Sequence, residues 1–216
     1  HAIEIYGDGH QISDMVHVAD GATALVVALE KAAAGTVFDR AAEVGPAEHR
    51  TVNEVAHDVG LRSNVTIMFG SVERPEHVAR HLLRTRALQR ETGGFTEFVP
   101  LPFVHMEAPI YLKGRSRRGP TFREAVLMHA IARLALHPLI TNIQTSWVKM
   151  GREGVKACLR SGANDLGGTL MDENISRAAG ASHGQGLDED GFRAIVEPLG
   201  RTLEQRSTLY ARVSGV

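Results

Sequence analysis

Beyond about residue 60, short apolar runs alternate with longer stretches in which apolar residues recur at helical spacing. Val65–Phe69 is an apolar run bounded by Gly70, a pattern typical of a buried parallel strand. Pro75 suits the first turn of a helix, which we expect to continue to Thr92, where a Gly-Gly pair ends it. The region therefore begins with one strand followed by one long helix.

The same alternation continues to about residue 168. Further strands are expected at Phe95–Pro100, Ile140–Thr145 and Asp165–Gly168, and further helices from the capping box at 121–124 to Leu136 and at Gly151–Arg160. Strands that alternate with helices pair in parallel through right-handed crossovers. Three or four such units make about half of an eight-stranded barrel of ~250 residues. We therefore predict an α/β fold, a partial (β/α) TIM-type barrel formed by its C-terminal strands and helices.

The first 58 residues have a different pattern, with strands expected at Ile3–Tyr6, Met15–Val18 and Thr36–Asp39, a helix after Asp20 and a capping box at 51–54. The stretches 5–9, 14–20 and 51–54 resemble the C-terminal part of nucleotide-sugar epimerases and dehydratases. Ser13 stands where that family usually has an arginine, and the Gly-rich dinucleotide turn and the Tyr-x-x-x-Lys pair are absent. We expect no cofactor site here, and we divide the chain into an epimerase-like leader segment at 1–58 and, at 59–216, the C-terminal half of the barrel with a C-terminal helix.

The composition is that of a globular protein, with 43% hydrophobic residues and a formal net charge of -1. This balance gives no electrostatic case for nucleic acid or an anionic membrane, and no apolar run approaches the ~20 residues that span a bilayer. A single cysteine fits a reducing cytoplasm. Because the chain does not begin with Met, we expect it to be a fragment or a trimmed chain.

A dense set of motifs follows residue 60. They are Gly60–Ser63, Thr66–Gly70, Thr92–His105, His137–Pro138, Ile143–Lys149, Asn164–Met171, Glu173, Ile175–Arg177, Ala179–Gly180, His183–Gly184, Gly200–Thr202, Gln205–Arg206 and Thr208–Tyr210. Over about 60–210 the chain resembles the tyrosine–uracil coupling half of FO synthase, a radical S-adenosylmethionine (SAM) enzyme of deazaflavin (coenzyme F420) synthesis. The resemblance implies transfer of the 4-hydroxybenzyl group of L-tyrosine to 5-amino-6-(D-ribitylamino)uracil.

The resemblance also implies a [4Fe-4S] cluster and SAM as cofactors, with the cluster held by a Cys-x-x-x-Cys-x-x-Cys motif. This chain has one cysteine, Cys158, on an apolar helical face, so we expect that it binds neither cofactor as it stands and that Cys158 is a small buried apolar residue. The abrupt junction at 57–60 fits a gene fusion, a rearranged gene or an assembly error. Two alternatives to an enzyme fragment stay open: a non-catalytic half-barrel that complements a partner or self-associates, and a nucleotide-sugar epimerase fragment.

Barrel enzymes place function at the carboxyl ends of strands, which selects the candidate site residues. Glu97 lies between apolar neighbours in an expected strand, so it either faces a substrate cavity or pairs with an arginine. His105 and Glu107 follow the end of that strand and could bind polar substrate groups or pass a proton.

Two further groups complete the candidate substrate-binding set. Asn142, Gln144 and Ser146 share one face of an expected strand, as in the wall of a hydrogen-bonding cavity. The last expected strand runs into a turn that offers free N–H groups and close backbone approach, formed by Asp165, Gly167, Gly168 and Thr169.

Overall fold

The computed structural model describes residues 3–6, 51–169, 174–183 and 186–213. The strands expected at Met15–Val18 and Thr36–Asp39, and the helix expected after Asp20, lie outside the described residues. So does most of the stretch that resembles nucleotide-sugar epimerases.

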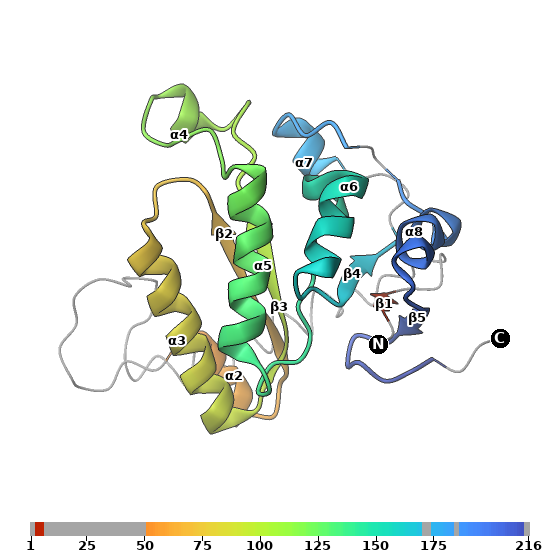
Figure 1. Cartoon of the computed structure of the whole chain (residues 1–216). Helices are drawn as coiled ribbons and strands as arrows, with labels where there is room; N and C mark the ends of the chain where they lie inside the picture. The colour runs from red at the N-terminus through yellow and green to blue at the C-terminus, as the bar shows by residue number, and fades with distance from the viewer. Residues whose placement is uncertain (1–2, 7–50, 170–173, 184–185, 214–216) are drawn as a thin grey trace.

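All strand pairs of the described sheets are parallel, as the alternating pattern predicted. Strand β2 (Ser63–Phe69) pairs with β3 (Phe95–Pro102) in a two-stranded sheet. A second sheet has the order β4–β1–β5, with β4 at Asp165–Gly168, β1 at Ile3–Tyr6 and β5 at Leu203–Arg206. The fold is thus mixed α/β with small parallel sheets (Figure 1).

The strand expected at Ile140–Thr145 is not a regular strand, although the segment lies between β3 and β4. It forms single parallel bridges, Phe98 with Ile143 and Gln144 with Asp165. The segment therefore links the two sheets without a continuous ladder.

Two asparagine side chains account for the interrupted ladder. The Asn142 amide Nδ2 donates to the Thr96 carbonyl at 2.8 Å, and the Ile143 N–H donates to the Asn164 side-chain oxygen at 2.9 Å. These bonds satisfy backbone groups that a regular strand would satisfy with its neighbours' backbones. Side-chain bonds thus take two of the backbone positions, while backbone bonds to Phe98 and Asp165 remain.

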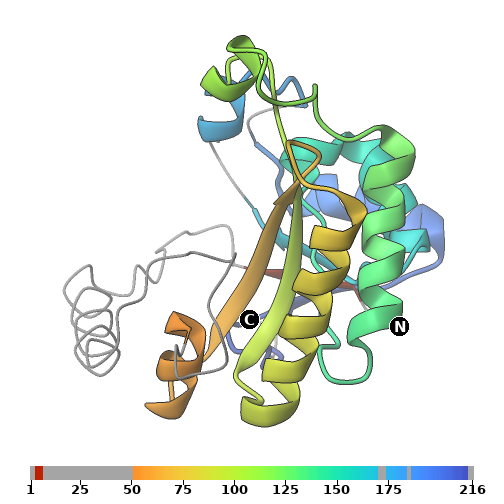
Figure 2. The ribbon, with the colours of Figure 1, turned by 90° about the vertical axis from the view of Figure 1, so that its left-hand side faces the viewer.

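The long helices begin where their capping boxes predicted. In α2 (Val52–Asp58) and α5 (Phe122–Leu136) the preceding threonine accepts from the backbone N–H of the third helical residue, a glutamate whose side chain bonds back. Helix α3 (Pro75–Thr92) has proline at its start and ends at Gly93, which adopts the left-handed conformation with φ 63°. Helices α3 and α5 lie side by side on one face of β2 and β3 (Figure 2).

Helix α6 (Trp147–Arg160) begins four residues before the expected start at Gly151 and is kinked there. Gly151 has φ 64° and ψ 173°, a conformation that a side chain would strain. A Cβ at this position would also lie 2.8 Å from Nδ1 of His183. The glycine therefore permits both the kink and the close packing of the His183 ring.

Several short elements were given no bounds by the sequence, although a helix was expected near the C-terminus. They are α4 (Pro109–Leu112), α7 (Ile175–Ala178), α8 (Glu189–Val196), the 3-10 helix η1 (Glu197–Leu199) and β5. Helix α8 is capped by Asp188, whose carboxylate accepts from the Gly191 N–H at 2.9 Å, and it buries Phe192 and Ile195 completely.

Among the described residues, the apolar core forms two clusters. The first packs α3 and α5 on β2 and β3 through Phe98, Leu136 and Ile143, and the second packs α6 and α8 on β4 through Leu159 and Leu166. Within the described ranges, no helix combines the length and the apolar character needed to cross a bilayer.

Candidate functional site

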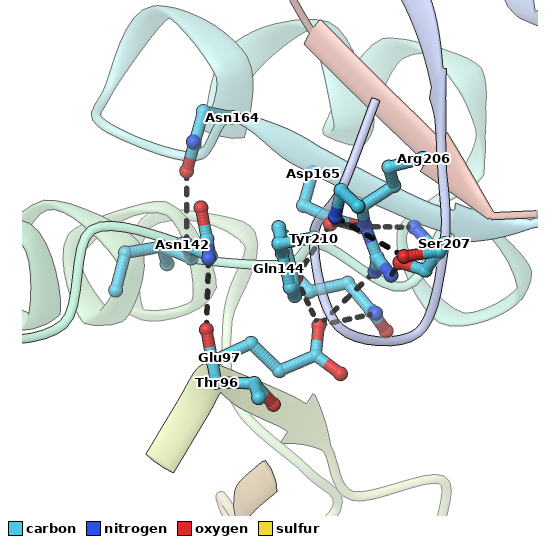
Figure 3. Close-up of polar contacts among 12 residues, drawn as sticks. Thr96, Glu97, Asn142, Gln144, Asn164, Asp165, Arg206, Ser207 and Tyr210 are labelled. Atoms are coloured by element: carbon cyan, nitrogen blue, oxygen red, sulfur yellow. Dashed lines mark hydrogen bonds and ion pairs between the residues drawn. The ribbon is translucent and has the colours of Figure 1, made fainter. Parts of the chain in front are cut away.

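Four ionisable side chains meet in the interior where β3, β4 and β5 come close together. Glu97 lies in β3, Asp165 begins β4, Arg206 ends β5, and Tyr210 lies in the turn that follows. Figure 3 shows the four side chains directed toward one another from these separate elements. Asp165 is 0% exposed, Arg206 4% and Glu97 9%. We call these four residues the acid–arginine cluster.

Arg206 is the cation of the cluster. Its Nε lies 2.6 Å from Asp165 Oδ2, and its Nη2 lies 3.4 Å from Glu97 Oε2. Its guanidinium carbon stands 3.9 Å above the centroid of the Tyr210 ring. Stacking on an aromatic face and bonding to two carboxyls suit the planar, weakly hydrated guanidinium better than an ammonium. Of the two interpretations for Glu97, pairing with an arginine is therefore present in the structure.

Tyr210 bridges the two carboxyls. Its hydroxyl oxygen lies 2.6 Å from Glu97 Oε2 and 2.7 Å from Asp165 Oδ2. Tyr210 has φ 62°, in the left-handed region that residues other than glycine rarely adopt. The turn from Ser207 to Tyr210 holds this conformation through a Tyr210 N–H to Ser207 carbonyl bond of 3.1 Å. Such backbone outliers are found most often where a side chain must be held in place for function.

Two predicted residues complete the surroundings of the carboxyls. The Gln144 amide Nε2 donates to Glu97 Oε2 at 3.0 Å, and the Gly167 N–H donates to Asp165 Oδ1 at 2.6 Å. Gly167 has φ 72°, and a Cβ there would come within 3.3 Å of the Gln144 amide. The turn after β4 thus needs glycine, both for its backbone and for the room taken by Gln144.

Burial dominates the electrostatics of the cluster. It raises the pKa of Glu97, the negative charge of Asp165 raises that pKa further, and the bonds with Tyr210 and Arg206 oppose the rise. Burial and the same two carboxyls raise the pKa of the Tyr210 phenol, which therefore keeps its proton. The raised pKa values of the buried acid and the buried phenol both favour the protonated, neutral forms.

Other predicted residues have structural contacts of their own. Asn142 bonds the backbone of β3, and Ser146 precedes α6, where its carbonyl accepts from the N–H groups of that helix's first turn. The Gly168 carbonyl accepts from Trp147 Nε1 at 3.3 Å, and Thr169 is buried at 9% exposure. Of the ten predicted residues, the structure therefore brings Glu97 together with three others, Gln144, Asp165 and Gly167.

His105 and Glu107 lie apart from the cluster. The His105 ring makes an edge-to-face contact with Tyr111 at a centroid distance of 4.6 Å. Glu107 is exposed, and its N–H donates to the Ala179 carbonyl at 3.2 Å. Among the described residues neither side chain has a hydrogen bond or ion pair with the cluster.

The sequence reasoning missed Arg206 and Tyr210 as candidate site residues. Both stand in motifs near the C-terminus, but no pattern around them indicates a strand end or a turn with positive φ. The signal that could have found them is charge balance, because a carboxylate expected inside a strand needs a cation somewhere in the chain.

The only cysteine of the chain does not fit an iron–sulfur ligand. Cys158 is fully buried in the core of α6 and packs beside His129 Nδ1 at 3.4 Å. Burial raises the pKa of its thiol to about 11, so the thiolate that binds iron is disfavoured. The expectation that Cys158 is a small buried residue is confirmed, and its buried, protonated thiol does not fit a ligand of a [4Fe-4S] cluster.

Comparison with known proteins places this architecture in a family. The model of the CofH/MqnC C-terminal region matches residues 92–212, which include the whole acid–arginine cluster. The chain belongs to this family. The expected resemblance over 60–210 is thereby confirmed.

Individual relatives agree with the family match. The FO synthase of Streptomyces coelicolor is 54% identical over 162 residues, which are 75% of this chain and 19% of that protein. The FO synthase of Mycobacterium leprae is 55% identical over 156 residues, or 72% of this chain and 18% of that protein. The 5-amino-6-(D-ribitylamino)uracil–L-tyrosine 4-hydroxyphenyl transferase of Methanopyrus kandleri is 48% identical over 166 residues, 77% of this chain and 45% of that protein. The chain thus spans less than half of each of these relatives.

Proposed function

We propose that residues 59–216 are the C-terminal half of the (β/α) barrel of a radical SAM enzyme, with a C-terminal helix, and that residues 1–58 are an epimerase-like leader segment whose strand β1 pairs with β4 and β5. The enzyme would transfer the 4-hydroxybenzyl group of L-tyrosine to 5-amino-6-(D-ribitylamino)uracil. The FO synthase of Streptomyces coelicolor and the tyrosine transferase of Methanopyrus kandleri support this proposal, because they are 54% and 48% identical to the chain over the matched residues.

The observation that carries the proposal is the acid–arginine cluster inside the family-matched region. A buried guanidinium, two carboxyls and a carboxamide offer donors and acceptors for the amine, carboxylate and hydroxyl groups of small polar substrates. We therefore propose Glu97, Gln144 and Asp165 as the centre of the substrate-binding residues. His105, Glu107, Asn142, Ser146, Gly168 and Thr169 are proposed to line more distant parts of the same site.

The radical chemistry itself needs a [4Fe-4S] cluster and SAM, which supply the oxidising radical when they are bound. Since Cys158 is unsuited to be an iron ligand, we propose that the residues that hold the [4Fe-4S] cluster come from sequence outside this chain. We propose that this chain contributes substrate-binding groups only.

A hybrid enzyme tests the proposal. Residues 59–216 would replace the matching part of the Streptomyces coelicolor FO synthase, and the coupled product of tyrosine and the ribitylaminouracil would be measured by mass spectrometry under anaerobic conditions. We expect product from the hybrid, a loss of at least tenfold with Asp165→Asn, and no change with Glu91→Gln, an exposed carboxylate on α3. A hybrid that carries normal iron content but forms no product would contradict the proposal.

A second candidate is a complementing module that docks with another half-barrel or a second copy. The outer edge of β2 has no strand partner within the described residues, and Met68 on that strand is 58% exposed. Unpaired edges promote association with other chains. Size-exclusion chromatography across a range of concentrations tests this candidate, and a stable monomer that unfolds cooperatively would argue against it.

A further inference from the structure

The hydrogen bonds around the Tyr210 hydroxyl require one proton more than that hydroxyl has. Its oxygen lies within 2.7 Å of Asp165 Oδ2 and 2.6 Å of Glu97 Oε2, yet a phenol donates a single proton. An ionised carboxylate only accepts. One of the two carboxyls must therefore be protonated and donate to the Tyr210 oxygen.

The contacts of the two carboxyls decide which one is the acid. Asp165 accepts from the Arg206 Nε at 2.6 Å and from the Gly167 N–H at 2.6 Å, the surroundings of a carboxylate. Glu97 accepts a hydrogen bond from the neutral amide of Gln144, and its contact with Arg206 is longer, at 3.4 Å. The acid proton therefore belongs on Glu97.

Charge balance independently requires that one of the two carboxyls is neutral. Two carboxylates beside Arg206 would leave one buried negative charge without a cation in the cluster. An uncompensated charge in the interior is costly, and such a group takes up a proton instead. With Glu97 neutral, Asp165 and Arg206 form a balanced ion pair.

We propose that Glu97 and Asp165 share one acid proton through the Tyr210 hydroxyl, so that the acid–arginine cluster is a proton relay. In the resting state Glu97 donates to Tyr210 and Tyr210 donates to Asp165. In the transfer step the O–H bond of Glu97 breaks as a new one forms at Tyr210, while the original Tyr210 O–H bond breaks and its proton goes to Asp165 Oδ2. No electrons are exchanged, and the total charge of the cluster is unchanged.

Among the described residues, the groups that face Glu97 act on its ionisation in both directions. Gln144 bonds to it as a neutral amide and Asp165 of β4 opposes its ionisation, whereas Tyr210, Arg206 of β5 and Asn64 of β2 favour its ionisation. Burial is the largest influence, and the pKa of Glu97 is raised in sum.

The chemical class that such a relay serves is a ligand group that gains or loses one proton, such as an amine or a phenol. Moving the proton between Glu97 and Asp165 leaves the total charge of the cluster unchanged, whereas a proton given to a ligand leaves one further negative charge beside Arg206. The relay is a property of this chain's own residues and does not depend on the activity proposed above.

Infrared spectroscopy of the whole chain at neutral pH tests the relay. We expect a carboxylic-acid C=O band that shifts in deuterium oxide, is lost in Glu97→Gln and is retained in the control Glu91→Gln. In Tyr210→Phe the band should stay but move, because its hydrogen-bond acceptor is gone. The proposal would be overturned if the wild-type protein had no acid band. It would also be overturned if the band of Tyr210→Phe had the same wavenumber as that of the wild-type protein.

A second measurement needs no variant and so does not depend on whether Glu97→Gln folds. In wild-type protein with 13C-labelled glutamate, we expect one side-chain carboxyl to titrate at clearly higher pH than the others. If all glutamate carboxyls titrate together, Glu97 is not the acid and the relay does not exist.

Discussion

At the scale of single residues, Arg206 decides whether the buried carboxyls can be accommodated. It is 4% exposed and contacts both Asp165 and Glu97, at 2.6 and 3.4 Å. Removing one member of a buried ion pair leaves the other charge without compensation, which costs more than the pair contributes. The cluster is therefore expected to respond strongly to changes at this one position.

We expect Arg206→Met to lower the free energy of unfolding by about 3–5 kcal/mol, because Asp165 then stays buried without its cation. In the double variant with Asp165→Asn, part of this loss should be recovered, with a coupling of about 1–3 kcal/mol. Urea unfolding of the four proteins measures the coupling.

The matched control is Arg193→Met, which removes an exposed ion pair with Glu189 on α8. Exposed pairs contribute about 1 kcal/mol or less. Equal decreases in the free energy of unfolding for Arg206→Met and Arg193→Met would show that the buried ion pair stabilises the fold no more than the exposed one.

Glu97 gives a prediction about pH. Because the folded protein raises the pKa of Glu97, mainly through burial, its acid form stabilises the fold below the unfolded pKa, and this stability is lost as pH rises toward the folded pKa. Glu97→Gln cannot lose a proton, so its stability should fall less between about pH 5 and about pH 8.

Thermal unfolding at both pH values measures this effect. The midpoint of Glu97→Gln should rise relative to that of the wild-type protein as the pH increases, while Glu91→Gln should follow the wild-type protein. A relative fall of the Glu97→Gln midpoint would mean that Glu97 is ionised in the folded state.

At the scale of elements, the contact between α2 and the strands beside it depends on His57. Its Nδ1 lies 2.7 Å from Thr92 Oγ1, its Nε2 lies 2.8 Å from Ser63 Oγ, and its ring meets Phe95 edge-on at 4.7 Å. A Cβ at Gly94 would lie 2.2 Å from the His57 ring. The glycine is therefore needed for α2 to pack where it does.

We expect Gly94→Ala to lower the free energy of unfolding by about 1–3 kcal/mol through overpacking against His57. In a His57→Ala background this penalty should largely disappear, because the ring is absent. Gly93→Ala is the control, because a Cβ there would have nothing within 4 Å. Its φ of 63° imposes a backbone penalty of about 1–2 kcal/mol, which should be the same with and without the His57 ring. Chemical denaturation measures all of these variants, and an unchanged Gly94→Ala penalty without the ring would contradict this position of α2.

At the scale of the whole molecule, the chain contains the acid–arginine cluster but not the three cysteines that would bind the iron of a [4Fe-4S] cluster. It corresponds to 19% of the Streptomyces coelicolor FO synthase and 45% of the Methanopyrus kandleri transferase. Its single cysteine is buried in the core.

Anaerobic reconstitution with iron and sulfide should therefore give this chain no stoichiometric cluster and no cleavage of SAM, because one protonated, buried thiol cannot hold the iron. The Streptomyces coelicolor FO synthase, treated in parallel, is the positive control. Iron and sulfide analysis with an assay for 5′-deoxyadenosine measures both, and stoichiometric uptake with SAM cleavage by this chain would contradict the expectation.

The sequence by itself determined the elements whose signals are local. The bounds of α3 and β4 and the capping-box starts of α2 and α5 agree with the pattern, because caps, prolines and terminal glycines act within one or two turns. The prediction of a regular strand at Ile140–Thr145 was wrong, because asparagine side chains that bond across 21 and 46 residues replace two of its backbone bonds.

Only the tertiary structure decided the cluster. The sequence indicated Glu97 as a carboxylate in need of a partner, but Tyr210 is 113 residues away and Arg206 is 109. No local pattern specifies such pairs, since they form only when β3, β4 and β5 converge. Burial at that point excludes water, which sets the charge balance and with it the proton that Glu97 holds.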